Sequence, residues 1–403
     1  MSSVTKTKSF LFIIGFTCPF PGAGWWRIFN FARHFGEKDY KCCVLSCFSL
    51  STIDSPKVVR NEQVYIYNVL PCIEVNNPFI LFLNNILASI ASIPSFLFFR
   101  PSAVIISVPP PDQLVPIFLL SKIMRRKIII DYRDEFEDYL IMNTRKWGFF
   151  YRFFKKFLTS LYRNAAMVTP VTPAVAEDLK RRGVHNVKVT YDGVDTKIFQ
   201  PYNKSKMRSE FHLPQDSFVI AYIGNIYKPY RVDVVIRALK QLNEKNPKRK
   251  YLLILAGGGD MKSVLDLANN LGISDSVKYF GVIKNPTEIA KILSSADCGI
   301  IPYDDNPLWQ KTYSTKLFEY CAVGLPVMAT VHENSALATA IKANHIGLIT
   351  PPINSDDLAT AIEILNIDKD SRLKMSSSAL QFARTYDKDK LARDLLETIE
   401  SLQ

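Results

Sequence analysis

One carboxylate, Glu319, lies in the largely apolar run of residues 315–323. The run predicts a short buried helix, which Gly324 and Pro326 end before a strand at 327–330. A buried carboxylate is costly unless hydrogen-bond donors satisfy it, and the two hydroxyls of a ribose would do so. Glu319 is therefore our first candidate for a nucleotide-binding residue. A core helix whose one acid is satisfied within the protein is the alternative.

Charged residues also gather at residues 131–135, directly after the apolar stretch 128–130. Such a concentration of charge at the end of a predicted strand favours a polar site over an ordinary surface. Asp131, Arg133 and Asp134 are candidate catalytic residues of such a site. A loop held together by salt bridges is the alternative interpretation.

Glycines follow three predicted strands, at Gly22 and Gly24, at Gly224, and at 257–259. Glycine lets backbone amides approach a phosphate or a sugar closely, and the start of a following helix favours an anion. A dinucleotide-binding motif would need a third glycine where Arg27 stands, which argues against a nicotinamide enzyme. Each glycine could instead mark a tight turn. Arg27 could pair with a phosphate or point into solvent.

Cations close to these glycines could neutralise a diphosphate. Lys228 and Arg231 follow Gly224 and could neutralise such a diphosphate, which makes them catalytic candidates. The start of the helix that holds Glu319 should offer exposed amides to phosphate oxygens, unless side chains there simply cap it. The remaining candidates for contact with a nucleotide sugar are Asn225, Gly258, Ser314, Thr315 and Lys316.

The elements that would position these residues alternate between strand and helix. A chain of 403 residues exceeds what one hydrophobic core usually supports, so we expect two domains. Both halves show the pattern of parallel sheets wrapped by helices, with ligands bound beyond the carboxyl ends of the strands. The predicted strands are residues 10–16, 44–48, 64–70, 104–108, 127–131, 167–171 and 187–191, then 218–224, 251–256, 277–280, 298–303 and 327–330.

Two segments resemble the family 4 glycosyltransferases, which are retaining enzymes of the GT-B fold. Residues 311–327 are similar to the sugar-nucleotide motif of that family, with Glu319 at its second glutamate and Lys311 in place of the first. Residues 191–201, rich in turn formers, are similar to its interdomain segment. The two cations that usually follow the glycine loop are absent, because Asn225 and Tyr230 occupy their places.

The resemblance implies an α/β fold in which two Rossmann-like, doubly wound domains face each other across a cleft. Residues 1–195 would bind the acceptor, 196–385 would bind the nucleotide sugar, and 386–403 would form a helix that packs back on the N-terminal domain. It implies transfer of a sugar from a nucleotide diphosphate sugar to a glycan, with no cofactor, metal or protein nucleophile. The segment 131–134 is similar to the Asp-x-Arg-Asp of a subgroup that builds bacterial surface polysaccharides.

Two other functions stay open at this point. A sugar-nucleotide epimerase has the same fold, although the two family segments fit the transferases better. A non-catalytic partner subunit would explain the departures at Lys311, Asn225 and Tyr230.

The net charge of +12 indicates an acidic partner. Five cations in residues 145–163 fall on one narrow arc of a predicted helix, and aromatic residues and leucines fill most of the remainder. Such a helix suits an anionic bilayer surface, and a core helix with a basic edge fits the pattern equally well. Residues 78–99 are apolar but contain Asn84, Asn85 and Pro94, so we expect two interfacial or packed helices there and no membrane span.

These features make a lipid-linked acceptor a coherent expectation. We expect no nucleic-acid partner, since no known binding module is recognisable. The seven cysteines are odd in number and widely spread, which favours reduced thiols over a disulfide framework. The first apolar stretch reads as a strand and not as a signal peptide. Together these observations predict a cytoplasmic protein associated peripherally with the inner face of the plasma membrane.

Overall fold

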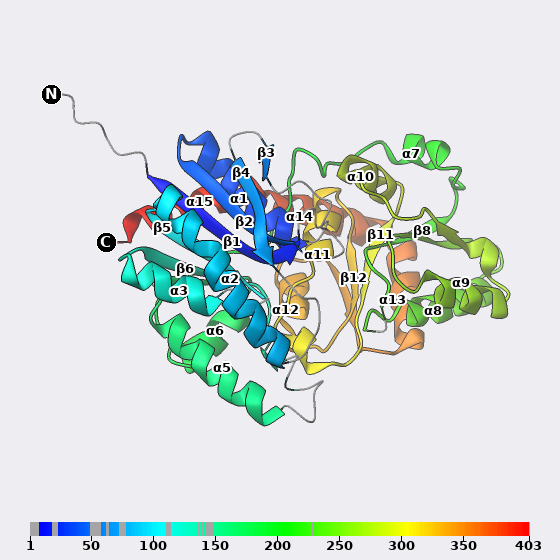
Figure 1. The fold of residues 1–403 in the computed structure, drawn as a ribbon. Coiled ribbons are helices and arrows are strands. Elements are labelled where there is room, and N and C mark those ends of the chain that lie inside the picture. The colour runs from blue at the N-terminus through cyan, green and yellow to red at the C-terminus, as the bar shows by residue number, and fades with distance from the viewer. Residues whose placement is uncertain are drawn as a thin grey trace. The chain divides into compact units, whose positions relative to one another are not determined.

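The computed structural model describes residues 8–17, 23–48, 58–61, 64–71, 78–109, 114–135, 137–138, 141, 148–227 and 229–402. The chain forms two compact α/β units (Figure 1). Unit 1 comprises Met1–Asp192 and Asp389–Gln403, and unit 2 comprises Gly193–Lys388.

Unit 1 is built on a sheet whose described strands are ordered β3-β4-β2-β1-β5-β6-β7. All of its strand pairs are parallel except β3 with β4. Its strands are β1 (Ser9–Thr17), β2 (Lys41–Phe48), β3 (Val58–Asn61), β4 (Val64–Pro71), β5 (Ala103–Val108), β6 (Lys127–Tyr132) and β7 (Met167–Pro170). Its helices are α1 (Ala23–Glu37), α2 (Pro78–Phe99), α3 (Leu114–Ile123), α5 (Gly148–Arg163), α6 (Pro173–Arg181) and α15 (Lys388–Ser401).

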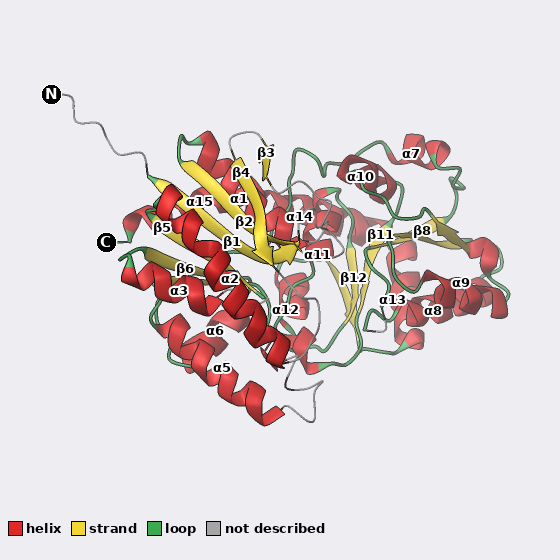
Figure 2. Cartoon of the chain, in the orientation of Figure 1, coloured by secondary structure: helices red, strands yellow, loops and turns green. Residues whose placement is uncertain are grey.

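Helices cover both faces of this sheet (Figure 2). Side chains alternate along a strand, so Leu11 and Ile13 of β1 join one core while Phe10 and Phe12 join the other. Helices α2, α3, α5 and α6 pack on the first face, and α1 and α15 pack on the second. Burial on both sides explains why these strands read as continuous apolar runs.

Helix α15 belongs to unit 1 although it follows unit 2 in the chain. Ala392, Leu395, Leu396 and Ile399 are spaced for one helix face and lie in the same core as β1 and α1. The expected packing of the last helix on the N-terminal domain is confirmed.

Two expectations for unit 1 are wrong. Residues 78–99 form one continuous helix, α2, with Pro94 inside it. Ala88 and Phe96 on its inner face are buried, and this packing outweighs the local cost of the proline. Residues 187–191 form a single bridge to β7 at Val187 and no strand. In the part of the chain that the structure describes, no helix has the length and apolar character needed to cross a membrane.

Unit 2 has a parallel sheet whose described strands are ordered β10-β9-β8-β11-β12-β13. The strands are β8 (Phe218–Ile223), β9 (Tyr251–Ala256), β10 (Val277–Tyr279), β11 (Cys298–Pro302), β12 (Val327–Thr330) and β13 (Gly347–Thr350). The helices are α7 (Lys204–Glu210), α8 (Val232–Lys245), α9 (Met261–Asn270), α10 (Pro286–Ser294), α11 (Thr315–Ala322), α12 (Ala336–Ala343), α13 (Ser355–Ile367) and α14 (Lys369–Thr385), with short 3-10 turns at Ser274–Ser276 and Pro307–Gln310. Helices α8, α9 and α13 share one core with β8 and β9.

The packing of α15 makes a first prediction. The change L396A should destabilise unit 1 by about 2–5 kcal/mol, the usual cost of truncating a buried leucine. Hydrogen exchange should show the loss of protection in β1 and α1 and leave unit 2 unchanged. L373A, which truncates an exposed leucine of α14, is the control. Equal loss of protection in both units would contradict this assignment of α15.

Candidate functional site

At the carboxyl end of β6, Asp131 is held in a buried network. Arg27 Nε donates to its Oδ1 at 2.9 Å, Ser107 Oγ donates to its Oδ2 at 3.1 Å, and Thr169 Oγ1 donates to its Oδ1 at 3.3 Å. Only 2% of the surface of Arg27 and 1% of that of Asp131 is exposed. These partners come from α1, β5 and β7, so the carboxylate ties four elements together.

The remaining donors of Arg27 are also satisfied within unit 1. Its Nη1 donates to the carbonyl of Tyr191 at 2.6 Å and its Nη2 to the carbonyl of Thr190 at 2.7 Å. Burial by itself would lower the pKa of Arg27, but the charges of Asp131 and Asp192 outweigh it and raise the pKa. From the sequence, Arg27 could pair with a phosphate or point into solvent, and the structure shows neither. The carbonyls of residues 190 and 191 accept from Arg27, so they are not available to extend a strand, although the amide of Thr190 still donates to the carbonyl of Pro170 at 2.9 Å.

Arg133 and Gly24 fit against each other. Arg133 Nε donates to Ser107 Oγ at 2.9 Å, and its Nη2 donates to the carbonyl of Pro109. A Cβ on Gly24 would lie 2.0 Å from Arg133 Nη1, so the missing side chain makes room for this guanidinium. Burial lowers the pKa of Arg133. Asp134 is exposed, and Gly22 lies outside the described residues.

The sequence candidates of unit 2 meet at Gly224, which follows β8. Its φ of +114° suits glycine, and a Cβ there would lie 2.8 Å from Lys316 Cε. The ammonium of Lys316 lies 4.7 Å from the ring centroid of Tyr230 and 5.3 Å from that of Tyr222. Lys316 thus crosses Gly224 and places its charge over two aromatic rings, a favourable contact. We had not anticipated the two tyrosines, because nothing in the sequence links them to Lys316.

Glu319 follows Lys316 by three residues on α11, so the two side chains share one side of the helix. Its carboxylate is partly buried and forms no side-chain hydrogen bond with any residue that the structure describes. Burial raises the pKa of Glu319, and the charges of Lys388 and Lys316 offset part of this rise. Burial lowers the pKa of Lys316 to about 8, against the opposing effect of Glu319. The donors expected around Glu319 are thus not supplied by the described part of the chain.

The start of α11 is not capped by a side chain. Ser314 occupies the N-cap position without accepting a hydrogen bond through its hydroxyl. The amide of Leu317 donates to the carbonyl of Ser314, while the amides of Thr315 and Lys316 precede the first intrahelical bond. These two amides are therefore open to an anion, and the predicted role of binding one stays a prediction. The capping alternative does not apply to Ser314.

Tyr320 positions α11 on the sheet. Its hydroxyl accepts from the amide of Ile223 at 3.3 Å and donates to the carbonyl of Ile300 at 3.2 Å, which joins α11 to the end of β8 and the middle of β11. A Cβ on Gly299 would lie 2.3 Å from the Tyr320 ring, so that glycine allows the close fit. The helix that carries Lys316 and Glu319 is thereby anchored at the carboxyl edge of the sheet.

The glycine run 257–259 serves mainly chain packing. A Cβ on Gly257 would lie 2.0 Å from the carbonyl oxygen of Gly224, and one on Gly259 would lie 2.2 Å from that of Ile226. Gly258 accepts from the amide of Ile226 at 2.8 Å, and a Cβ on Gly258 would lie 3.6 Å from Asn225 Oδ1. The structure thus brings Asn225 and Gly258 to the loop that Lys316 crosses.

Arg231 lies at the start of α8, where its charge is engaged by a neighbour. Its Nε and Nη2 donate to the two carboxylate oxygens of Asp233 at 2.8 and 2.7 Å. Lys228 lies outside the described residues. The role of these two cations at a diphosphate stays a prediction, and Lys316 is the cation that the structure places at Gly224.

Comparison with known families agrees with this architecture. The model of the glycosyl transferases group 1 matches residues 203–382, and that of Glycosyltransferase Family 4 matches residues 25–198. The chain belongs to glycosyltransferase family 4. The predicted family and its GT-B fold are therefore confirmed.

Solved structures of the same fold match nearly the whole chain. Sucrose-phosphate synthase of Thermosynechococcus elongatus aligns with a TM-score of 0.79 at 15% identity, over 98% of this chain and 99% of that one. HepE of Anabaena, solved with UDP and glucose, aligns with a TM-score of 0.70 at 17% identity, over 98% and 100%. WaaG, a glycosyltransferase involved in lipopolysaccharide biosynthesis, aligns with a TM-score of 0.71 at 15% identity, over 97% and 100%.

Among sequence relatives, D-inositol 3-phosphate glycosyltransferase of Stackebrandtia nassauensis is 31% identical over 230 residues, which are 55% of this chain and 50% of that protein. The same enzyme of Corynebacterium aurimucosum is 26% identical over 209 residues, 50% of this chain and 48% of that protein. The chain thus spans about half the length of these relatives.

The buried pair in unit 1 makes a second prediction. The change R27M leaves Asp131 buried without its cation and should lower the free energy of unfolding by about 3–5 kcal/mol. The control R33Q removes a more exposed arginine, which bonds Asp389 at 2.9 Å, and should cost about 1 kcal/mol or less. Denaturant unfolding of unit 1, followed by tryptophan fluorescence, measures both. Equal losses for the two variants would show that Asp131 is not held as described.

Proposed function

We propose that the protein is a retaining glycosyltransferase that moves a sugar from a nucleoside diphosphate sugar to a glycan acceptor. One observation carries the proposal: α11 presents a carboxylate without a hydrogen-bond partner among the described residues, an ammonium three residues before it, and two helix-start amides. A ribose needs an acceptor for its hydroxyls, and a diphosphate needs donors and positive charge. Both needs are met on one helix.

The proposed roles follow from these placements. Glu319 accepts hydrogen bonds from the ribose hydroxyls. The amides of Thr315 and Lys316 donate to the diphosphate, and the ammonium of Lys316 neutralises it. Gly224 keeps the approach free of a side chain, since a Cβ there would lie against Lys316. We assign no metal and no cofactor to this step.

In the proposed reaction, the bond from the anomeric carbon to the diphosphate oxygen breaks, and the acceptor oxygen bonds to the same face of the sugar. The proton of the acceptor hydroxyl passes to the departing diphosphate. Negative charge grows on that leaving group, so the fixed donors of α11 stabilise the transition state more than the ground state. Lys228 and Arg231 are proposed to add to this stabilisation.

We further propose a uridine diphosphate sugar as donor and a lipid-linked glycan of bacterial surface polysaccharide as acceptor, at the inner face of the plasma membrane. The support is the resemblance of residues 131–134 to a polysaccharide-building subgroup, together with the UDP bound in HepE and the involvement of WaaG in lipopolysaccharide biosynthesis. In unit 1, Asp134 is exposed for contact with an acceptor, whereas Asp131 and Arg133 hold the strand end that carries it.

Turnover of a panel of nucleotide sugars tests the proposal as a whole. The expected result is slow hydrolysis of one donor, and faster consumption of that donor, with transfer of its sugar, when an acceptor lipid is added. Interconversion of the donor into an epimer would favour an epimerase. Absence of both binding and turnover for every donor would favour a non-catalytic subunit.

The role of Glu319 makes a third prediction. The change E319Q should weaken the binding of uridine diphosphate by about 10–100-fold, because hydrogen bonds to a charged acceptor are lost. It should also raise the melting temperature of the free protein, since a partly buried charge is removed. Calorimetry measures both effects, with E333Q at an exposed glutamate as control. Unchanged nucleotide affinity in E319Q would refute the ribose assignment.

Lys316 makes a fourth prediction, on pH. With its pKa at about 8, the ammonium is present below this pH and lost above it, so donor binding should weaken as the pH rises from 7 to 9.5. K316R keeps its charge throughout and should bind with little dependence on pH, whereas K316M should bind weakly at every pH. K262R, at an exposed lysine of α9, is the control and should follow the wild type. Identical pH profiles for the wild type and K316R would exclude this role.

A further inference from the structure

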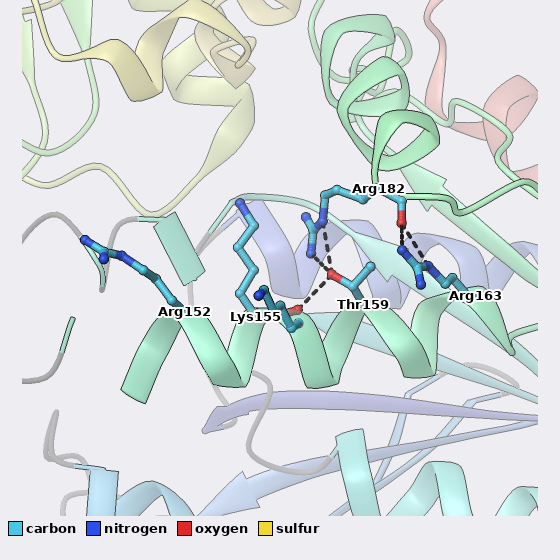
Figure 3. A pocket seen from close by; sticks show the side chains of 6 residues that line it. Arg152, Lys155, Thr159, Arg163 and Arg182 are labelled. Atoms are coloured by element: carbon cyan, nitrogen blue, oxygen red, sulfur yellow. Dashed lines mark hydrogen bonds between the residues drawn. The ribbon is translucent and has the colours of Figure 1, made fainter. Parts of the chain in front are cut away.

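A basic groove lies in unit 1 between α5 and the end of α6 (Figure 3). Its volume is about 520 Å³. The residues that line it are Arg152, Lys155, Lys156, Thr159, Arg163 and Arg182. Five of these side chains are cationic, and no acidic residue is found among the described residues that line the groove. The cations of α5 were visible in the sequence, but the contribution of Arg182 from another helix was not.

Part of this positive charge has no ion pair among the residues that the structure describes. Lys155 donates to both oxygens of Asp138 at 2.6 Å, and Arg182 lies 3.7 Å from Asp178. Arg152 and Lys156 form no ion pair with any residue that the structure describes. The groove therefore has charge available for an anion.

Arg182 is fixed in place before any ligand arrives. Its Nε donates to Thr159 Oγ1 at 3.1 Å and its Nη1 to the hydroxyl of Tyr132 at 3.4 Å. Its guanidinium also lies 5.9 Å from the ring centroid of Tyr162. Arg163 Nε in turn donates to the carbonyl of Arg182 at 2.8 Å. A fixed guanidinium loses little freedom when it binds a phosphate.

The outer side of α5 exposes phenylalanines next to these cations. Phe149, Phe153 and Phe157 follow each other at intervals of four residues and are 85%, 66% and 41% exposed. The inner face of the same helix is buried through Tyr151, Leu158 and Tyr162. A stripe of cations beside a stripe of exposed aromatic rings is typical of helices that lie in a membrane interface.

The neighbouring helices extend this apolar surface. Helix α2 packs beside α3, and α3 packs beside α5. Helix α2 exposes Ile86, Ile90, Ile93 and Leu97, which are spaced for a single face, and α3 exposes Leu119 and Ile123. Large apolar patches of this kind mark an interaction surface.

We propose that the groove binds the phosphate of an anionic lipid headgroup while the phenylalanines of α5 enter the outer part of the same lipid layer. The inference deepens the proposed function, on which it rests for the choice of a membrane as partner. Charge complementarity selects an anion, and the adjoining apolar side chains of three helices select a lipid over a water-soluble polyanion.

The test of the charge uses the variant R152Q/K156Q and sedimentation with vesicles. The wild type should bind vesicles of equimolar phosphatidylcholine and phosphatidylglycerol, and bind phosphatidylcholine alone weakly. Loss of two cations should weaken binding to the anionic vesicles by about 10–30-fold, at roughly 1 kcal/mol for each cation. K248Q/R249Q removes the same charges from an exposed segment of unit 2 and should bind like the wild type.

The test of the apolar contact uses F149S/F153S, with I367S/L373S at exposed sites of unit 2 as its control. Only the first variant should lose the part of the binding that persists at high salt. Phe149 and Phe153 are exposed, so F149S/F153S should keep the melting temperature of the wild type, which is measured alongside.

Three outcomes would overturn the inference. Equal vesicle binding by R152Q/K156Q and the wild type would exclude the groove. Full competition by millimolar glycerol phosphate would assign it to a free anion. Tighter binding to an RNA oligonucleotide, lost in the same variant, would assign it to nucleic acid. Uridine diphosphate binding by R152Q/K156Q should be unchanged, so failure of the donor site and failure of the lipid site are told apart.

Discussion

The central constraint on the candidate site is the carboxylate of Glu319, which forms no side-chain hydrogen bond with any residue that the structure describes. This carboxylate is partly buried, and the charges of Lys388 and Lys316 offset only part of the effect of burial on its pKa. The helix is held in place nevertheless, because Tyr320, on the next position of α11, is bonded to the end of β8 and the middle of β11. A rigid helix with an unsatisfied acid is a preorganised binding group, since a ligand that supplies donors recovers the cost of burial.

In unit 1, by contrast, the buried charged side chains are hydrogen-bonded within the unit. At the end of β6, Asp131 and Arg27 satisfy each other, and Arg133 is bonded to Ser107 and fills the space that Gly24 leaves. These side chains order the loop at the edge of the sheet. Exposed charge in this unit lies instead along α5, beside phenylalanines. One unit thus has an acid without a hydrogen-bond partner among the described residues, where we propose that a sugar nucleotide binds, and the other has cations without an ion pair among them, where we propose an anionic surface.

The regular elements were largely predictable because burial on both faces gives parallel strands a continuous apolar pattern. The errors arose where tertiary contacts outweigh local preference. Pro94 does not break α2, because the helix packs along the core through Ala88 and Phe96. The amides of Lys188 and Thr190 donate to carbonyls of β7, but the carbonyls of residues 190 and 191 accept from Arg27 and do not extend a strand. The strands β3 and β13 were missed, because β3 ends in Arg60 and Asn61 and β13 has only Leu348 and Ile349 as apolar residues, so neither forms a continuous apolar run.

The sequence by itself determined the two α/β units, the family, and the placement of Glu319 on a short helix before a strand. Those properties depend on local periodicity and on residues close together in the chain. Only the tertiary structure decided which charges pair. Arg27 meets Asp131 across 104 residues, and Lys316 meets the ring of Tyr222 because α11 packs against the end of β8. The order of strands in a sheet decides which residues distant in sequence lie next to each other, and local sequence patterns carry no information about that order.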